Sequence, residues 1–113
     1  SDSFEKSVLE RESKISTAMD GVLALPHPMT ICSTKSQIAV AILEHPVKWS
    51  EKENAQIILM LSLADDKKKN IKALYDTFVA ITNNPSLTNL LLRAESMLEF
   101  LQILEDNIPE NAY

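Results

Sequence analysis

The chain has 113 residues, of which 45% are apolar and 24% are charged, and its formal net charge is −5. This length suits one domain, and its apolar runs are shorter than the roughly 20 residues that cross a bilayer, which excludes membrane insertion. The acidic balance argues against direct nucleic-acid contact, because phosphate binding needs clustered Lys and Arg, and these occur only at 67–69.

The N-terminal residues and the cysteine content bear on the cellular compartment of the protein. The first residues do not combine a basic stretch with an apolar one, so no secretion signal is expected. The single cysteine, Cys32, cannot close an intrachain disulfide. We therefore expect a cytoplasmic protein.

The first half of the chain predicts one helix followed by strands. Residues 3–12 place Phe4, Val8 and Leu9 on one stripe at helical spacing, with Ser3 as a candidate N-cap. The runs at 21–25, 37–44 and 55–64 are nearly continuous and apolar. Such runs are typical of strands that are covered on both faces.

The second half predicts helices. From residue 65, apolar residues recur at spacings of three and four up to Ile81, which indicates an amphipathic helix ending near the Asn-Asn-Pro at 83–85. Residues 85–95 predict another short helix. At 96–104, Ser96 and Glu99 have the spacing of a capping box. The residues expected to face inward from this last helix are Leu98, Leu101 and Leu104.

These elements together predict an α/β fold, a layered sandwich in which a mixed sheet is flanked by helices. We assign residues 1–104 to one domain and residues 105–113 to a C-terminal tail. No internal repeat and no low-complexity linker interrupts the domain.

Metal and cofactor chemistry finds little support in the sequence. A zinc site needs three or four ligands with close pairs, whereas the two histidines lie eighteen positions apart and there is one cysteine. The stretch at 32–36 lacks the glycines of a phosphate-binding loop. We expect no metal and no cofactor, and we interpret His45 as a surface histidine and Trp49 as a packing residue.

His27 has a more unusual setting, because it stands between two prolines at the end of a predicted strand. The prolines stiffen the loop and remove backbone donors, which presents the imidazole rigidly. A histidine in such a place is more often structural, but an uncharged imidazole can attack phosphorus. Upstream, Arg11, Ser16 and Thr17 supply the guanidinium and hydroxyl groups that a phosphoryl group needs nearby.

The segment 8–28, VLERESKISTAMDGVLALPHP, resembles the active-site segment of the type-2 EIIA domains, the fructose and mannitol class of the bacterial sugar phosphotransferase system (PTS). It has their Arg-Glu pair, Ser-Thr pair and glycine upstream of a Pro-His. The similarity continues through 36–64 and into the C-terminal helices, to about residue 104. It implies the mannitol and fructose IIA-like fold, with the strand and helix that usually open this family missing here.

This resemblance implies a chemistry. In the family, the histidine after the proline takes a phosphoryl group from phospho-HPr and passes it to an EIIB domain, and that histidine is His27 here. The arginine of the Arg-Glu pair assists the phosphoryl group and corresponds to Arg11, while Ser16 and Thr17 are expected to donate hydrogen bonds. The domain would then be a phosphocarrier rather than a free-standing metabolic enzyme.

One position separates two roles within the family. Transport members often carry a second histidine where this chain has Asn70, and an asparagine cannot carry charge, so onward relay should be slow. The chain is most similar to the EIIA-like modules of BglG-type sugar-operon regulators. We therefore expect phosphorylation of His27 to control a transcription activator or antiterminator through regulatory domains of the same polypeptide. The alternatives are a phosphocarrier of a fructose- or mannitol-class transport system and an interaction module that is never phosphorylated.

Overall fold

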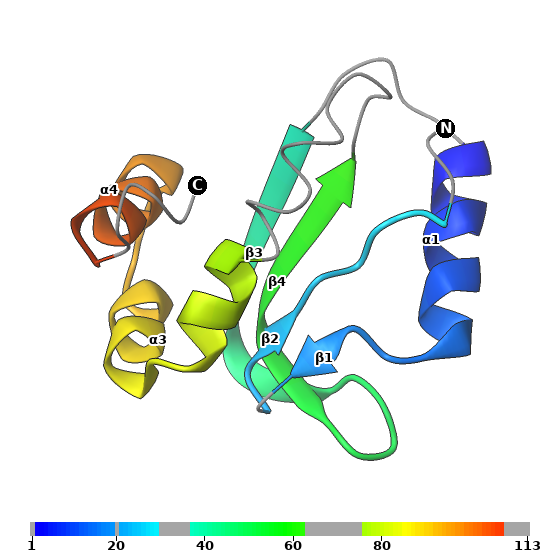
Figure 1. The fold of residues 1–113 in the computed structure, drawn as a ribbon, viewed down its shortest axis with the longest axis horizontal. Coiled ribbons are helices and arrows are strands. Elements are labelled where there is room, and N and C mark those ends of the chain that lie inside the picture. Colours follow the sequence, from blue (N-terminus) through cyan, green and yellow to red (C-terminus); the bar gives the residue numbers. More distant parts are fainter. Residues whose placement is uncertain (1, 20, 30–36, 63–75, 108–113) are drawn as a thin grey trace. The chain divides into compact units, whose positions relative to one another are not determined.

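A computed structural model describes residues 2–19, 21–29, 37–62 and 76–107 (Figure 1). The chain divides into two compact units, Ser1–Lys67 and Lys68–Tyr113. The first unit contains α1 (Asp2–Lys14), β1 (Ala18–Met19), β2 (Leu23–Ala24), β3 (Gln37–Lys48) and β4 (Asn54–Ser62). The second contains helical residues 76–82, α3 (Pro85–Leu92) and α4 (Met97–Asn107).

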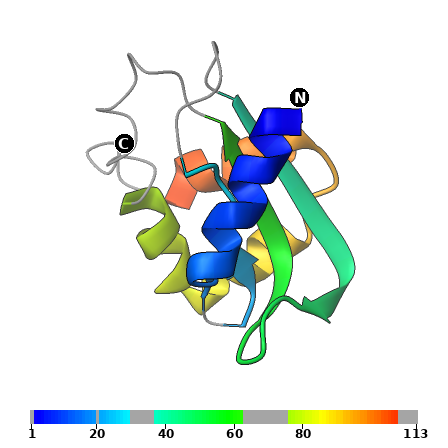
Figure 2. The same ribbon diagram turned by 90° about the vertical axis from the view of Figure 1, so that its right-hand side faces the viewer.

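The strands form one four-stranded mixed sheet in the order β1-β2-β4-β3. β1 and β2 are antiparallel, with Ala18 opposite Ala24, and β2 runs parallel to β4, with Leu23 opposite Ile57. β3 and β4 are antiparallel and are the two long strands in Figure 2, joined by the loop at 49–53. The predicted α/β class with a mixed sheet is confirmed.

The expectation that all three apolar runs are covered on both faces is wrong for β3. Leu23 and Ala24 of β2 are buried, whereas most of β3 is exposed, and Ile38 keeps 45% of its surface accessible. The reason is position, because β3 ends the strand order and, among the described residues, pairs with β4 alone. An edge strand has a neighbouring strand on one side only, so its side chains are less enclosed than those of a central strand.

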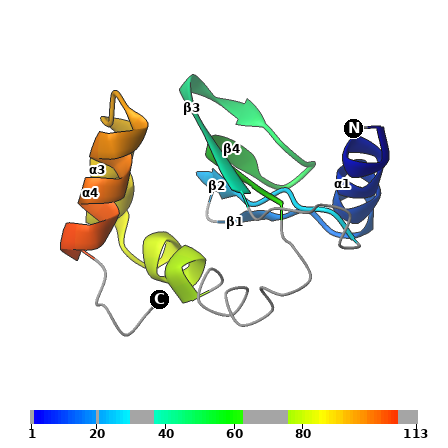
Figure 3. The same cartoon turned by 90° about the horizontal axis from the view of Figure 1, so that it is seen from above.

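Helix α1 is longer than the predicted 3–12 and lies beyond the β1 side of the sheet, away from β3 (Figures 1 and 3). Val8 is buried, but its stripe neighbour Leu9 is exposed. In the middle of α1, the hydroxyl of Ser7 accepts a hydrogen bond from the backbone N–H of Met29 at 2.9 Å. This bond ties the helix to the segment that follows β2.

For the first helix of the second unit, the periodicity of the sequence predicts the buried residues that the structure describes. Phe78 and Ile81 are buried on the helical residues 76–82, and residues 63–75, where we expected this helix to begin, lie outside the described residues. Helix α3 begins after Asn84, whose side-chain oxygen accepts from the backbone N–H of Leu87 at 3.1 Å. A side-chain acceptor at this position satisfies a donor that the first helical turn leaves unpaired.

Helix α4 corrects one prediction. The hydroxyl of Ser96 accepts from the backbone N–H of Glu99 at 3.1 Å, as a capping box requires. The residue buried on α4 is Phe100, however, while Leu98 is 79% exposed and Leu101 is also exposed. The apolar residues of this helix spread over a wider arc than its enclosed face, so their spacing alone does not decide which of them is buried, and the large aromatic ring takes the enclosed position. The helix continues to Asn107.

The turn between β1 and β2 depends on Gly21. The backbone N–H of Val22 donates to the carbonyl of Met19 at 3.3 Å, and Gly21 has a φ of 74°, in the left-handed region. The N–H of Gly21 also donates to the carboxylate of Glu53 at 2.9 Å, which joins this turn to the loop between β3 and β4. The turn therefore needs a residue that adopts a positive φ and has a backbone N–H to donate to Glu53.

We expect Gly21→Ala to destabilise the fold by roughly 1–2 kcal/mol, the cost of the left-handed conformation for a residue with a Cβ. An added Cβ would meet nothing within 4 Å, so this cost is conformational and not steric. The measurement is urea unfolding of the purified variant, with Gly21→Asn as the control, because asparagine tolerates this conformation better. Equal stability of the Ala variant and the wild type would contradict the argument.

Candidate functional site

His27 lies just beyond the carboxyl end of β2, after the buried residues Leu25 and Pro26, and is itself partly buried. Its Nδ1 is 2.8 Å from the carbonyl oxygen of Leu25. A carbonyl only accepts, so Nδ1 carries the hydrogen of this bond. The neutral ring then has its lone pair on Nε2, which makes Nε2 the nucleophilic atom.

The backbone on either side of His27 is tied to other elements. The carbonyl of Pro26 accepts from the N–H of Leu61 on β4 at 3.0 Å. Two residues after the histidine, Met29 is bonded to Ser7 of α1. The loop that carries the imidazole is therefore fixed by the sheet on one side and by the helix on the other.

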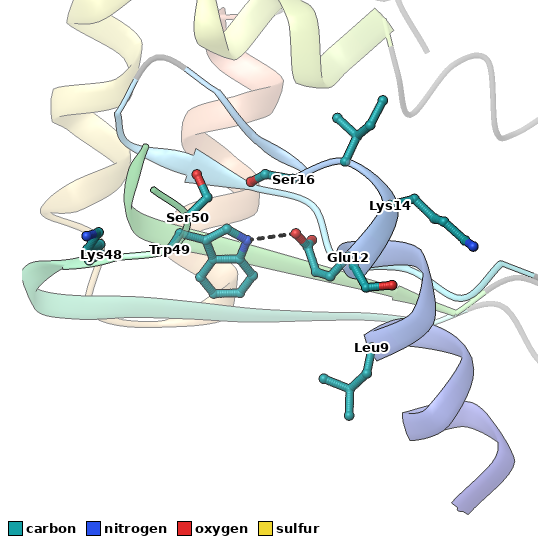
Figure 4. Close-up of a pocket in the computed structure, with 9 residues that line it drawn as sticks. Leu9, Glu12, Lys14, Ser16, Lys48, Trp49 and Ser50 are labelled. Atoms are coloured by element: carbon teal, nitrogen blue, oxygen red, sulfur yellow. Dashed lines mark hydrogen bonds between the residues drawn. The ribbon is translucent and has the colours of Figure 1, made fainter. Parts of the chain in front are cut away.

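A partly buried hydrogen-bond network connects this loop to the end of α1 and to Trp49. The Glu12 carboxylate accepts from the hydroxyl of Thr17, from the backbone N–H of Thr17 at 3.1 Å, and from Trp49 Nε1 at 3.1 Å (Figure 4). The same hydroxyl accepts from the backbone N–H of Leu25 at 3.2 Å. Thr17 is 7% exposed, and no buried side-chain polar atom of the described residues lacks a partner.

The indole ring of Trp49 packs against small side chains. Ala18, Ala24 and Ala55 form a buried cluster on β1, β2 and β4, and Trp49 and Ile58 pack against it. Three methyl groups on adjacent strands leave room for an indole ring, and its N–H then meets the end of α1 (Figure 4). The interpretation of Trp49 as a packing residue is confirmed, and its bond to Glu12 is additional.

The other predicted site residues have local partners. Arg11 Nη1 donates to the carbonyl of Ile15 at 2.5 Å, across the last turn of α1. The hydroxyl of Ser16 accepts from the backbone N–H of Ala18 at 3.1 Å. The structure thus connects Thr17 to Leu25, the residue that binds His27. Arg11 and Ser16 instead bond to Ile15 and Ala18, close to them in the chain. Asn70 and Cys32 lie outside the described residues.

Sequence reasoning missed the role of Glu12. In the sequence, Glu12 is marked only as the second residue of the Arg-Glu pair, and the family resemblance assigns a role to the arginine of that pair. The bond to Trp49 spans 37 positions, and no local pattern predicts such a contact.

A surface pocket of about 470 Å³ lies beside this network, between the end of α1 and residues 48–50 (Figure 4). Glu12 and Trp49 line it and His27 does not. The side chain of His45 is 83% exposed, as expected of a surface histidine. Among the described residues there is no cluster of three or more potential metal ligands, and none of their helices is long and apolar enough to cross a membrane.

The sequence profile of the family described as "Phosphoenolpyruvate-dependent sugar phosphotransferase system, EIIA 2" matches residues 1–107. The chain belongs to this family. The resemblance to the type-2 EIIA domains is therefore confirmed, and the protein is an EIIA domain of that type.

Comparisons with individual proteins agree with the family. The EIIA domain is 24% identical over 102 residues to the "Probable licABCH operon regulator" of Bacillus subtilis, covering 90% of this chain and 16% of that regulator. The chain therefore spans less than a fifth of the length of that relative. This similarity supports the predicted likeness to operon regulators.

Solved structures share the fold. A Streptococcus pyogenes crystal structure assigned as a PTS IIA domain superposes with a TM-score of 0.75 at 20% identity, covering 95% of this chain and 71% of that one. The Escherichia coli complex of enzyme IIAMTL and phosphorylated enzyme IIBMTL matches with a TM-score of 0.68 at 17% identity, covering 91% and 73%. At these identities the likeness shows the fold alone.

We expect Glu12→Ala to cost the EIIA domain about 2 kcal/mol of unfolding free energy, because it removes the acceptor of three donors, among them the hydroxyl of buried Thr17. Arg11→Ala is the matched control, since it changes the adjacent residue of the same helix and removes one exposed bond, worth about 0.5 kcal/mol. Urea unfolding measures both. A loss for Glu12→Ala no larger than that for Arg11→Ala would show that the network contributes little.

Proposed function

We propose that this EIIA domain accepts a phosphoryl group from phospho-HPr on Nε2 of His27. The observation that carries the proposal is the 2.8 Å bond between Nδ1 and the Leu25 carbonyl, which reserves the lone pair of the ring for Nε2. The tied backbone at Pro26 and Met29 keeps the ring in one place. Holding the acceptor in line with the donor is most of what a protein contributes to phosphoryl transfer.

The transfer balances without a further reactant. The lone pair of Nε2 attacks phosphorus, the bond between phosphorus and the donor breaks, and its electron pair stays with the donor. Nδ1 keeps its hydrogen, so the ring becomes cationic. The Leu25 carbonyl already accepts from Nδ1–H, and this bond strengthens when its donor is charged.

The oxygens of the phosphoryl group need donors, and Arg11 is the candidate clamp. A guanidinium has five N–H donors, and the bond to the Ile15 carbonyl uses one of them. Ser16, Thr17 and Asn70 are the candidate supporting residues. In the present structure the Thr17 hydroxyl gives its hydrogen to Glu12, so donation to phosphate would require this hydroxyl to turn.

We infer a regulatory destination for the phosphoryl group. The similarity to an operon regulator that is much longer than this chain supports a sensing domain within a cytoplasmic transcription activator or antiterminator. The phosphoryl oxygens of a phosphohistidine carry close to two negative charges, which the cationic ring offsets only in part, and they add to a domain whose formal net charge is −5. Such a change is large enough to repel an acidic surface or recruit arginines in the regulatory domains of the same polypeptide.

A second candidate is a phosphocarrier that passes the group to an EIIB domain of a transport system. The fold likeness to IIAMTL, which was solved with phosphorylated IIBMTL, favours it. Both candidates require the same chemistry at His27 and differ in where the group goes next.

Incubation with phospho-HPr should label the domain on one residue, with a phosphate that is lost in acid and stable in base, as expected of phosphohistidine. His27→Ala should abolish the label. His45→Ala is the matched control and should label normally, because this exposed histidine pairs weakly with Glu44 at 3.9 Å. Mass spectrometry locates the phosphate. A folded His27→Ala protein that still accepts it would refute the proposal.

The regulatory role predicts slow discharge. The phosphorylated domain should pass its label slowly to fructose- and mannitol-class EIIB domains, and Asn70→His should accelerate transfer, because an imidazole can become cationic beside the phosphoryl group. A rapid-quench time course with a panel of EIIB domains measures this. Fast discharge by the unmodified domain, with no effect of Asn70→His, would favour the transport role.

A further inference from the structure

Two backbone groups of Leu25 link His27 to the interior. Its carbonyl accepts from His27 Nδ1, and its N–H donates to the Thr17 hydroxyl. These groups belong to successive peptide units, joined only through the φ and ψ angles of Leu25. The following Pro26 restricts those angles to the extended region, and the Leu25 side chain is buried. The bond that holds the Leu25 N–H therefore also fixes the direction of the Leu25 carbonyl, which orients the His27 ring.

The Thr17 hydroxyl can serve Leu25 only because its single hydrogen goes elsewhere. That hydrogen is donated to Glu12, which leaves the lone pairs of Oγ1 to accept from the Leu25 N–H. Without a carboxylate at position 12, the hydroxyl would rotate, and its hydrogen would compete for the space that faces Leu25.

Glu12 is in turn held by donors from two directions. Trp49 Nε1 and the backbone N–H of Thr17 reach the same carboxylate oxygen, each at 3.1 Å. The indole rests on the alanine cluster, so it cannot follow a change of the Glu12 side chain. Three donors converge on two oxygens, an arrangement that a carboxylate satisfies and a carboxamide, with one oxygen and one NH₂ group, does not.

We propose that Glu12 is a positioning residue for His27, acting through Thr17 and Leu25 to keep the ring proton on Nδ1 and the ring lone pair on Nε2. For its kinetic consequence this inference rests on the proposed phosphorylation of His27. For the state of the ring it stands on the hydrogen bonds alone.

The test compares His27 ring nitrogens and labelling rates in matched variants. Long-range ¹H–¹⁵N NMR should show a protonated Nδ1 and an unprotonated Nε2 in the neutral wild type. Glu12→Gln and Thr17→Val keep the side-chain volumes and break the network, so both should shift the His27 tautomer ratio and slow labelling by phospho-HPr about tenfold. Thr17→Ser keeps the hydroxyl and should bring both readouts back toward the wild type.

Glu53→Gln is the control for a general effect of losing a partly buried carboxylate. Glu53 also accepts from a backbone N–H, that of Gly21, and comes from the same loop as Trp49, but it has no bond to Thr17 or Leu25. It should leave the His27 nitrogens and the labelling rate as they are. Equal changes in this variant and in Glu12→Gln would overturn the inference.

The experiments distinguish failure of the proposed phosphorylation from failure of the positioning role of Glu12. A wild-type domain that phospho-HPr never labels refutes the proposed function, and the tautomer comparison still decides the role of Glu12. Folded Glu12→Gln and Thr17→Val proteins with the wild-type tautomer ratio overturn the positioning role, whatever their labelling rate. If either variant does not fold, Trp49→Phe replaces it, because this variant keeps a ring on the alanines and removes one donor to Glu12. It should shift the His27 tautomer ratio in the same direction by a smaller amount. An unchanged ratio in Trp49→Phe would then overturn the inference.

Discussion

The first unit of this EIIA domain depends on one carboxylate. Backbone bonds join the strands to one another, but the pairing of the sheet does not include α1. Glu12 joins the end of α1 to Thr17 before β1 and to Trp49 beyond β3. An acceptor with three donors is costly to remove from a partly buried place, because each donor is then left without a partner.

The same constraint explains why small residues lie on β1, β2 and β4 where Trp49 packs. The indole must reach Glu12 while lying against β1, β2 and β4, and the alanines at 18, 24 and 55 allow this approach. Larger side chains there would fill more apolar volume and move the ring away from α1. The packing of the indole and its hydrogen bond are therefore coupled, because the position of the ring decides whether Nε1 reaches Glu12.

Much of the fold could be predicted from the sequence, and the reasons for success and failure are physical. Helices and strands follow from local periodicity, and His27 stands out because two prolines flank it. The exposure of β3 could not be predicted, because a strand's place in the sheet is set by its partners. Leu98 was predicted to face inward and is exposed, because the apolar arc of α4 is wider than its enclosed face. The bond between Glu12 and Trp49 joins segments far apart in the chain, which leaves no local pattern.

The bond between His27 Nδ1 and the Leu25 carbonyl limits how a phosphorylation signal could be read. The carbonyl accepts from Nδ1–H when the ring is neutral, and it accepts the same hydrogen more strongly once Nε2 carries phosphate and the ring is cationic. Phosphorylation then strengthens this bond. A partner can therefore sense the added charge at the carboxyl end of β2 without any change in the bond that sets the ring.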